Sequence, residues 1–393
     1  MRPSRRALAI EPFHAMAFGD LASELEAAGH RTVRLNLGEP DFGAPAAVRR
    51  AMVEAMDGRP LSYTSALGMP ALRSAIAGFY RDRHGVDLDP ARVAITMGAS
   101  AALVLAIAAT VDEGDDVLMA DPSYPCNRQD VASFGGRAVT IPTSPATRFQ
   151  LTRDLIEQHW TPATRVVMAA TPSNPTGTSI PPAELAAICD LARERGAWRL
   201  IDEIYLETAD PSPDGTPQPT ALAHDPDAIV VSSFSKAFGM TGWRLGWMVL
   251  PEALVDPVER LAVNYFLSAA APVQIAALEC FTPASLAEAE GRRLDLLGRR
   301  RLMLDGLARI GLPVEVEPDG AFYAFADVSS TGMDAWMFCG RALREAHVAL
   351  TPGRDFGTAH GDTHVRLSYA ASAEDITLGL ERLGRWLDTL RSG

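Results

Sequence analysis

The sequence predicts an α/β protein, with a large domain built on a mostly parallel sheet covered on both faces and a smaller α+β domain. Short continuous apolar runs alternate with helical patterns between residues 92 and 250, which is typical of a buried parallel sheet. After Val255 the chain becomes helical, with one long helical pattern over 284–310. Beyond that helix, the hydrophobic period indicates short strands mixed with helices.

The length of 393 residues and the hydrophobic content of 47% suit two well-cored domains. We expect the large domain to cover residues 43–285. Residues 1–42 and 286–393 are expected to form the small domain, because the segment before Gly43 is polar and amphipathic and can join the C-terminal unit.

In the large domain, the expected elements follow in chain order. Helices are expected from Ser100 onward and over 182–195. The Pro- and Asp-rich stretch 208–219 predicts a surface loop. Apolar runs predict strands at 93–96, 116–119, 165–168, 198–201, 228–231 and 245–248. In the small domain we expect helices over 334–347 and 373–390, and strands at 314–317, 322–327 and 364–367.

Composition excludes several classes of protein. A net charge of −13 argues against a nucleic-acid or anionic-membrane partner. The four cysteines form no C-x-x-C pair, and His360 and His364 lack the glutamate partner of a metalloprotease motif, so we expect no metal. The apolar stretch near the N-terminus is too short for a signal sequence, so a cytoplasmic location is expected.

The chain has 36 lysine and arginine residues, and only one of them, Lys236, is lysine. A guanidinium stays protonated, whereas an amine can lose its proton and attack a carbonyl carbon. Lys236 lies between an apolar run and a Gly-rich segment, where a Schiff-base lysine is expected. The alternative is a stray surface lysine in an Arg-biased chain.

Polar or small residues follow five of the apolar runs. In a parallel sheet the carboxyl ends of the strands meet at one edge, so these segments are expected to converge on one crevice. The segments are 98–100, 121–124, 174–177, 202–203 and 233–236.

A lysine that forms a Schiff base implies pyridoxal phosphate, whose ring is an electron sink. The ring nitrogen needs an anion, and Asp202 is the candidate, although a turn cap is the commoner use of an isolated Asp. Tyr205 can donate to the phenolic oxygen or be a core tyrosine. Tyr124 can stack on the ring, and Asn174 can point at the cofactor or close a turn.

The phosphate needs a cradle. Gly98, Ala99 and Ser100 precede a helix, whose N-terminus favours an anion, although a tight turn with a serine cap explains them equally well. Arg244 together with Ser233 can neutralise a phosphate dianion.

These residues stand in motifs that run nearly from end to end: LNLGEPDF, YTSALG, TMGAS, DPSYPCN, SNPTG, DEIY, SFSKAFGMTGWRLGW, GAFYAF and HVRLSYA. In this order and spacing, the chain resembles class I/II aminotransferases of the fold-type I pyridoxal-phosphate family. The resemblance implies ping-pong transamination between an amino acid and a 2-oxo acid. The motifs are highly specific for the family and much less specific for the substrate.

The resemblance also implies residue roles. Lys236 corresponds to the Schiff-base lysine and proton carrier, and Arg366, with the backbone amide of Gly38, to the group that binds the substrate α-carboxylate. Tyr63 corresponds to a tyrosine that reaches the phosphate of the neighbouring subunit, which implies a homodimer. The implied cofactor contacts are Asp202 at the ring nitrogen, Tyr205 and Asn174 at the phenolic oxygen, Tyr124 on the ring, and Ala99, Ser100, Ser233 and Arg244 at the phosphate.

The chain departs from some relatives at the substrate pocket. Aspartate-specific relatives carry a lysine where this chain has Ser100, so a dicarboxylate preference is less favoured unless an arginine substitutes. Arg128 and Arg354 are candidates, or else surface residues. Asn127 stands where an aromatic residue is common. A neutral or hydrophobic amino donor is expected, with Phe18, Phe322 and Tyr323 as candidate pocket or core residues.

Two other functions stay open, and a third is disfavoured by the sequence. A β-eliminating lyase, decarboxylase or racemase shares this fold and these contacts. A regulatory protein on the same scaffold would keep the fold without the reaction. A nicotinamide dehydrogenase needs a Gly-rich fingerprint after the first strand, which this sequence lacks.

Overall fold

The computed structural model describes residues 1–11 and 14–392. Its α-helices are α1 Arg5–Ala9, α2 His14–Ala27, α3 Ala46–Ala55, α4 Pro70–His84, α5 Gly98–Thr110, α6 Pro125–Ser133, α7 Arg153–His159, α8 Pro182–Glu194, α9 Glu252–Tyr265, α10 Ala271–Ala277, α11 Pro283–Ile310, α12 Ala335–Arg341 and α13 Ala373–Ser392. Its strands are β1 Val33–Arg34, β2 Val93–Thr96, β3 Asp116–Asp121, β4 Arg137–Pro142, β5 Thr164–Ala170, β6 Trp198–Asp202, β7 Ile229–Ser233, β8 Gly246–Val249, β9 Tyr323–Asp327, β10 Val348–Ala349, β11 Thr351–Pro352 and β12 His364–Ser368.

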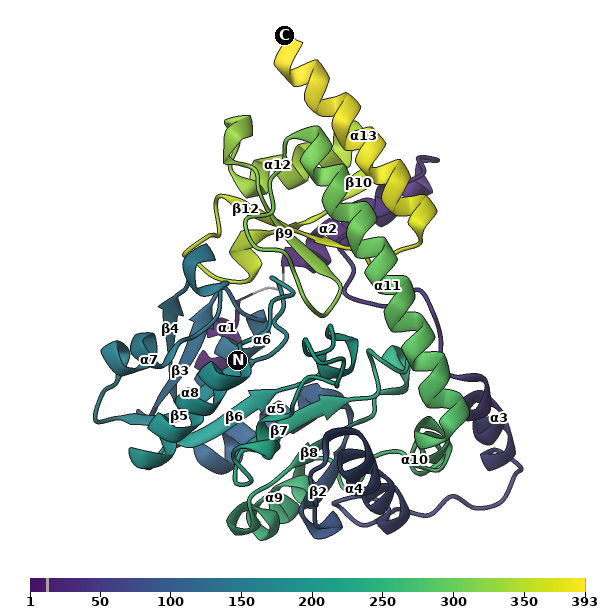
Figure 1. Cartoon of the computed structure of the whole chain (residues 1–393), viewed down its shortest axis with the longest axis vertical. Coiled ribbons are helices and arrows are strands. Elements are labelled where there is room, and N and C mark those ends of the chain that lie inside the picture. The colour runs from purple at the N-terminus through teal and green to yellow at the C-terminus, as the bar shows by residue number, and fades with distance from the viewer. Residues whose placement is uncertain (12–13, 393) are drawn as a thin grey trace.

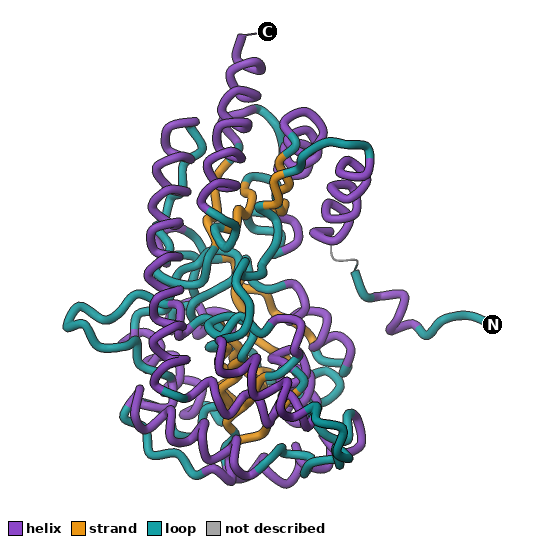
Figure 2. The backbone as a smooth tube through the Cα atoms, turned by 90° about the vertical axis from the view of Figure 1, so that its right-hand side faces the viewer, coloured by secondary structure: helices purple, strands orange, loops and turns teal. Residues whose placement is uncertain are grey.

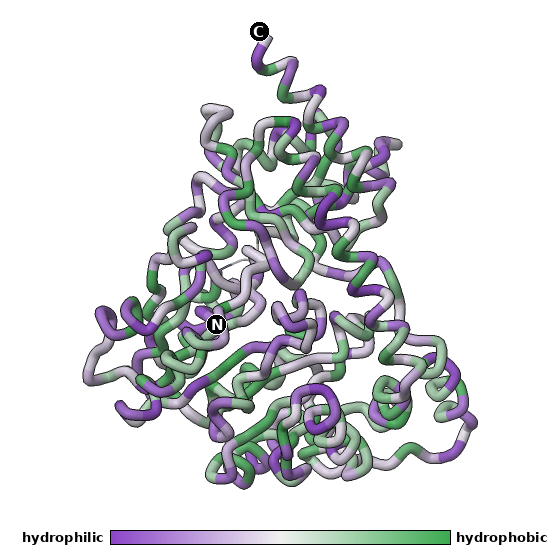
Figure 3. Tube along the Cα trace, viewed as in Figure 1, coloured by the Kyte–Doolittle hydropathy of each residue, from purple (hydrophilic) through white to green (hydrophobic). Residues whose placement is uncertain are grey.

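The core of the molecule is a seven-stranded sheet in the order β2-β8-β7-β6-β5-β3-β4. Only β8 runs antiparallel to its neighbours, because it returns directly from β7. Alternate residues of each strand enter different apolar clusters, so that Ile201 and Leu200 lie on opposite faces. Helices cover both faces (Figure 1), and the apolar colouring follows the strands (Figure 3). The predicted fold class is therefore confirmed.

One strand of this sheet was not predicted. β4 forms the edge of the sheet and pairs only with β3. Most of its residues are partly or fully exposed, and Arg137 reaches back to pair with the buried carboxylate of Asp116 at 2.5 Å. An edge strand needs no continuous apolar run, so the sequence signal for a buried strand is missing here.

The C-terminal part forms a second layer of structure around the antiparallel sheet β11-β12-β9. β1 pairs in parallel with β10, and Val33 and Leu35 lie in the same apolar cluster as Leu383 of α13. The strand predicted at 314–317 is wrong, since that stretch is a loop. Within this loop Glu315 pairs with His364 of β12 at 3.0 Å. Just beyond it, the Asp319 carboxylate pairs at 2.8 Å with Arg148, which lies between β4 and α7.

α11 connects the two parts of the molecule (Figure 1). The Thr282 side chain accepts a hydrogen bond from the Ser285 amide at its start, and Gly311 ends it with a left-handed φ of 78°. Such a cap satisfies terminal backbone groups that the helix leaves free. At the other end of the chain, α1 projects from the body (Figure 2), and none of its residues is buried.

A carboxylate joins the large sheet to the C-terminal part. Asp121, the last residue of β3, accepts hydrogen bonds from the amide of Thr358 at 2.9 Å and of Ala359 at 3.3 Å. Gly357 is required beside it, because a Cβ there would lie 1.8 Å from an Asp121 oxygen. The Arg128 guanidinium donates to the carbonyls of Asp355 and Phe356 at 3.0 Å each. These bonds fix segment 355–359 against the carboxyl end of β3.

None of the helices described above combines the length and hydropathy that a bilayer span requires. Within residues 1–11 and 14–392, no three histidine, cysteine or acidic side chains converge as a metal site.

Candidate active site

The carboxyl ends of β2, β3, β5, β6 and β7 open onto one cavity of about 590 Å³. The predicted convergence of five segments is therefore confirmed. The cavity is lined by Ala99, Ser100, Tyr124, Asn174, Asp202, Tyr205, Ser233, Lys236 and Arg244 from the large sheet, and by Gly38 and Arg366 from the two ends of the chain.

Lys236 extends into this cavity from the turn after β7. Its Nζ donates to the carbonyl of Gly38 at 2.7 Å and lies 5.6 Å from the centre of the Phe322 ring. The pKa of this amine is lowered from 10.5 to about 8, chiefly by burial; Glu39 and Asp202 oppose the shift, while Arg366 and Arg244 contribute to it. A buried ammonium loses hydration, so the neutral, nucleophilic form is favoured.

Asp202 ends β6 at the floor of the cavity and is 6% exposed. The amide of Ile204 donates to its carboxylate at 3.0 Å. Burial raises its pKa to about 6, although this hydrogen bond and the charge of Lys236 act in the opposite direction. A carboxylate in this position can hold a cationic ring nitrogen, which would restore the ionised form.

Tyr205 lies in the segment after β6, and its hydroxyl is 2.8 Å from that of Tyr323. Both phenols are buried. Burial raises the pKa of each phenol, so each keeps its proton at neutral pH. Tyr323 lines the cavity, as one of the two sequence readings expected. Phe18 and Phe322 belong to the C-terminal core instead.

An anion cradle forms where α5 begins. Gly98 has φ of 78°, and a Cβ there would lie 2.6 Å from Nη2 of Arg244. Gly246 leaves equally little room, since its Cβ would be 2.9 Å from the Ala99 amide nitrogen. Because these two positions are glycines, Arg244 and the start of β8 can pack directly against the N-terminus of α5. Free amides and the helix dipole at that end favour an anion. Ser100 and Ser233 also line this part of the cavity.

Arg366 on β12 is 3% exposed and pairs with no carboxylate among the described residues. It donates to Oδ1 of Asn174 at 2.9 Å and to the carbonyl of Asn36 at 2.7 Å. Its guanidinium carbon lies 4.4 Å from the Tyr323 ring centre, and its Nε has no partner. A buried guanidinium with a free donor suits a small carboxylate anion.

Three predicted residues need separate mention. Gly38 contacts Lys236 through its carbonyl, and a Cβ at this position would lie 2.5 Å from the Tyr323 hydroxyl. Tyr124 lines the cavity from the start of α6. Tyr63 is 81% exposed and does not line the cavity of its own chain.

Several residues that line the cavity were not among the predicted site residues; Met16, Leu37, Glu39 and Ile204 are examples. Leu37 and Glu39 stand inside the motif LNLGEPDF, which is the sequence signal for them. Arg354 lies outside the cavity and pairs with Asp362 at 2.5 Å on the surface.

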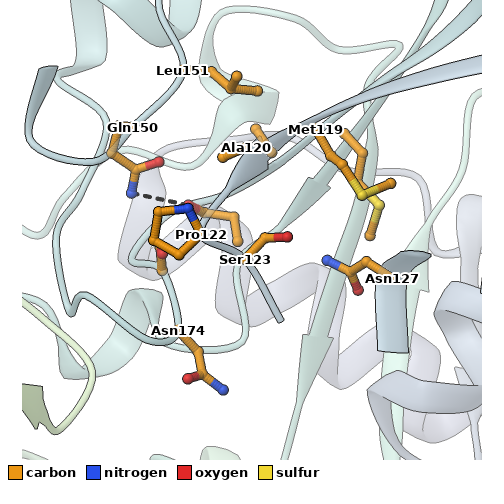
Figure 4. A pocket seen from close by; sticks show the side chains of 12 residues that line it. Met119, Ala120, Pro122, Ser123, Asn127, Gln150, Leu151 and Asn174 are labelled. Atoms are coloured by element: carbon orange, nitrogen blue, oxygen red, sulfur yellow. Dashed lines mark hydrogen bonds between the residues drawn. The ribbon is translucent and has the colours of Figure 1, made fainter. Parts of the chain in front are cut away.

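A second, much smaller cavity of about 20 Å³ shares Asn174 with the large one; Figure 4 shows its lining residues. Ser123 and Asn127 line it, and their Oγ and Oδ1 atoms are buried without a partner. Asn127 therefore contributes to this inner cavity rather than to the wall of the large one. The space is that of about one water molecule.

The fold and this site define a class of enzyme that binds pyridoxal phosphate: a single amine of lowered pKa faces a carboxylate, a phenol and an anion cradle. The residues fit that cofactor, since glycine at position 98 leaves free the space beside the Arg244 guanidinium that a Cβ would fill. The buried Arg366 guanidinium, with its unpartnered Nε, has the geometry to bind a small carboxylate.

Comparison with known proteins specifies the class. Residues 31–383 match the family model of aminotransferase class I and II. A valine–pyruvate aminotransferase from Mycobacterium tuberculosis is 42% identical over 96% of this chain and 97% of its own. A crystal structure of an aminotransferase from Mycobacterium tuberculosis has a TM-score of 0.94 at 42% identity, covering 99% of this chain and 100% of that one. Aspartate aminotransferase from Thermus thermophilus with maleate has a TM-score of 0.92 at 34% identity, covering 98% and 100%.

The chain belongs to the class I and II aminotransferases. It is a pyridoxal-phosphate enzyme that transfers an amino group between an amino acid and a 2-oxo acid.

Proposed function

We propose that the preferred amino donor is an L-amino acid with a neutral, apolar side chain. The observation that carries this proposal is the set of cations in the cavity. Among the described residues, only Lys236, Arg244 and Arg366 bring positive charge to its lining. The reaction, the cofactor phosphate and the α-carboxylate require one each, so no cation is left for a second carboxylate.

The remaining lining supports the same choice. Leu37 and Met16 are partly exposed apolar residues at the cavity, and Glu39 adds a negative charge there. Arg128 is committed to backbone carbonyls of segment 355–359. The relative named for valine and pyruvate is consistent with an apolar donor.

We further propose the residue roles on which transamination depends. When bound, pyridoxal phosphate supplies the electron sink that makes the α-proton of the amino acid acidic. Arg366 binds the α-carboxylate and orients the Cα–H bond, aided by Asn174. The neutral amine of Lys236 then removes the α-proton and delivers it again, which requires its lowered pKa.

Other side chains hold the cofactor. Asp202 keeps the ring nitrogen protonated, and the Tyr205 hydroxyl with the Asn174 amide orients the phenolic oxygen. Tyr124 covers the ring. The phosphate is assigned to the cradle residues Ala99, Ser100, Ser233 and Arg244. Since donor and acceptor acids both need Arg366, they bind in turn, which gives ping-pong kinetics.

The enzyme is proposed to be a homodimer. Tyr63 is exposed in one chain, and Leu61, Val53 and Met56 are apolar residues exposed near it in the sequence; a second copy can cover them and receive Tyr63 at its phosphate. The domain division at residues 43–285, with 1–42 and 286–393 as the small domain, is proposed from the separate apolar clusters. Four free cysteines support a cytoplasmic location.

Borohydride reduction of the purified holoenzyme, followed by peptide mapping, tests the central assignment. The expected result is a pyridoxyl group on Lys236 and nowhere else. A panel of amino donors then tests the specificity: valine, leucine and phenylalanine should convert the bound cofactor to its amine form faster than aspartate or glutamate. Release of ammonia with return of the aldehyde form would instead indicate a lyase.

Mixed dimers test the role of Tyr63. Lys236→Ala and Tyr63→Ala chains are each expected to be nearly inactive alone. A heterodimer of the two contains one site with both native residues, so the purified heterodimer should show about half of the activity of the native dimer. No recovery in a verified heterodimer would contradict the assignment of Tyr63 to the neighbouring site.

A further inference from the structure

The hydroxyl groups of Tyr205 and Tyr323 form a hydrogen-bonded pair inside the cavity. Their oxygens are 2.8 Å apart, and the two residues are 5% and 1% exposed. Tyr205 follows β6 of the large sheet, whereas Tyr323 begins β9 of the C-terminal sheet. Among the described residues, each hydroxyl has only the other as a hydrogen-bond partner.

A phenol has one proton to donate and can accept further hydrogen bonds. If Tyr205 donates to the phenolic oxygen of the cofactor, its proton is committed and its oxygen can only accept from Tyr323. We propose that Tyr323 is a positioning residue, which donates its hydrogen bond to Tyr205 and thereby fixes the direction in which Tyr205 donates to the cofactor. This inference rests on the proposed role of Tyr205.

The surroundings of Tyr323 leave its hydroxyl little freedom. Its ring lies 4.4 Å below the guanidinium carbon of Arg366 and 4.9 Å from the Phe322 ring. Gly38 stands so close that a Cβ there would lie 2.5 Å from the hydroxyl oxygen. One side chain thus supports the carboxylate-binding arginine with its ring and orients Tyr205 with its hydroxyl.

Hydrogen bonds in a chain polarise one another, so a donor that also accepts is a stronger donor. A hydrogen bond that stabilises the ionised phenolic oxygen should lower the pH midpoint of the cofactor titration by roughly 1–2 units. If the hydroxyl of Tyr323 strengthens the hydrogen bond from Tyr205 by about 10–30%, its loss should raise this midpoint by roughly 0.1–0.6 unit.

The experiment uses the holoenzyme and records the visible absorbance of bound pyridoxal phosphate against pH. The variants are Tyr323→Phe, Tyr205→Phe and the double variant, each of which keeps the aromatic ring. Tyr369→Phe is the matched control, since Tyr369 is 1% exposed and its hydroxyl donates to the Gly320 carbonyl, at 3.3 Å. The ionisable groups around the pair, Arg366, Asp202, Lys236 and Glu39, are unchanged in all of them.

Tyr323→Phe should raise the titration midpoint by roughly 0.1–0.6 unit in the native background and by nothing in the Tyr205→Phe background. Tyr205→Phe alone should raise it by roughly 1–2 units, and Tyr369→Phe should leave it unchanged. The KM for the amino acid should stay near native in Tyr323→Phe, because the ring under Arg366 is retained.

Two outcomes overturn the inference. An unchanged midpoint in Tyr323→Phe removes the orienting role, and an equal shift with and without the Tyr205 hydroxyl shows that Tyr323 acts by another route. Both leave the pyridoxyl label on Lys236 intact. Failure of the proposed function would look different, since the native protein would carry neither the label nor visible absorbance, and the inference would fall with it.

Discussion

The lowered pKa of Lys236 predicts an unusual reactivity of the apoprotein. With a pKa of about 8 instead of 10.5, roughly one amine in ten is unprotonated at pH 7, compared with about one in 3000 for an ordinary lysine. Only the unprotonated amine attacks a carbonyl carbon. The initial rate of reductive methylation at Lys236 should therefore rise with pH and level off above a midpoint near 8.

Two variants separate the causes of this shift. Glu39→Gln removes a negative charge that favours the ammonium form, so the midpoint should fall further. Arg366→Met removes a positive charge that disfavours the ammonium, so the midpoint should rise. The burial of the amine is the largest cause and stays the same in both variants.

The assay is simple because the chain has a single lysine. Formaldehyde with cyanoborohydride is applied briefly to the apoprotein at a series of pH values, and mass spectrometry of the Lys236 peptide gives the rate. The N-terminal peptide is quantified separately. A native midpoint of 10 or above would refute the reasoning, and so would shifts of the same sign in the two variants.

Substitutions can test three of the contacts described above. Arg366→Lys keeps the charge but loses the fork that binds a carboxylate, so kcat/KM should fall roughly 10- to 100-fold, mainly through KM, in steady-state assays; an unchanged KM would contradict the assignment. Gly98→Ala places a methyl group 2.6 Å from a nitrogen of Arg244, so equilibrium dialysis should show at least tenfold weaker cofactor binding, about 1.4 kcal/mol, and native affinity would disprove a tight cradle. Asp121→Ala removes the acceptor of the Thr358 amide, so the free energy of unfolding in urea should fall by about 2–4 kcal/mol; a native value would show that this contact is dispensable.

Sequence patterns predicted the buried strands because a strand covered on both faces must be apolar throughout. β6 and β7 are examples, with every residue buried or nearly so. β4 was not predicted, because an edge strand is only partly buried and needs no continuous apolar run. A strand was predicted at 314–317 because valine and glutamate alternate there with the strand period. Among the described residues, this stretch pairs with no strand, so it stays a loop.

The sequence predicted which segments meet at the site where polar residues follow strand ends, as at Asp202 and Lys236. Arg366 was expected only from the resemblance of its motif, because it lies within β12 of the C-terminal sheet. The pairing of Tyr205 with Tyr323 was not predictable, because it joins residues 118 positions apart through the meeting of two sheets. Distances of that kind depend on how the parts dock, which no local pattern encodes.

The contact between Lys236 and the Gly38 carbonyl, together with the seat of Arg366 on Asn36 and Asn174, has a consequence for biosynthesis. The parallel pairing of β1 with β10 joins residues 33–34 to residues 348–349, so the early segment can take its place in the fold only after β10 has been synthesised. A chain that ends before β12 lacks Arg366, the proposed carboxylate-binding residue. We therefore expect the site to be completed only when nearly the whole chain has been made.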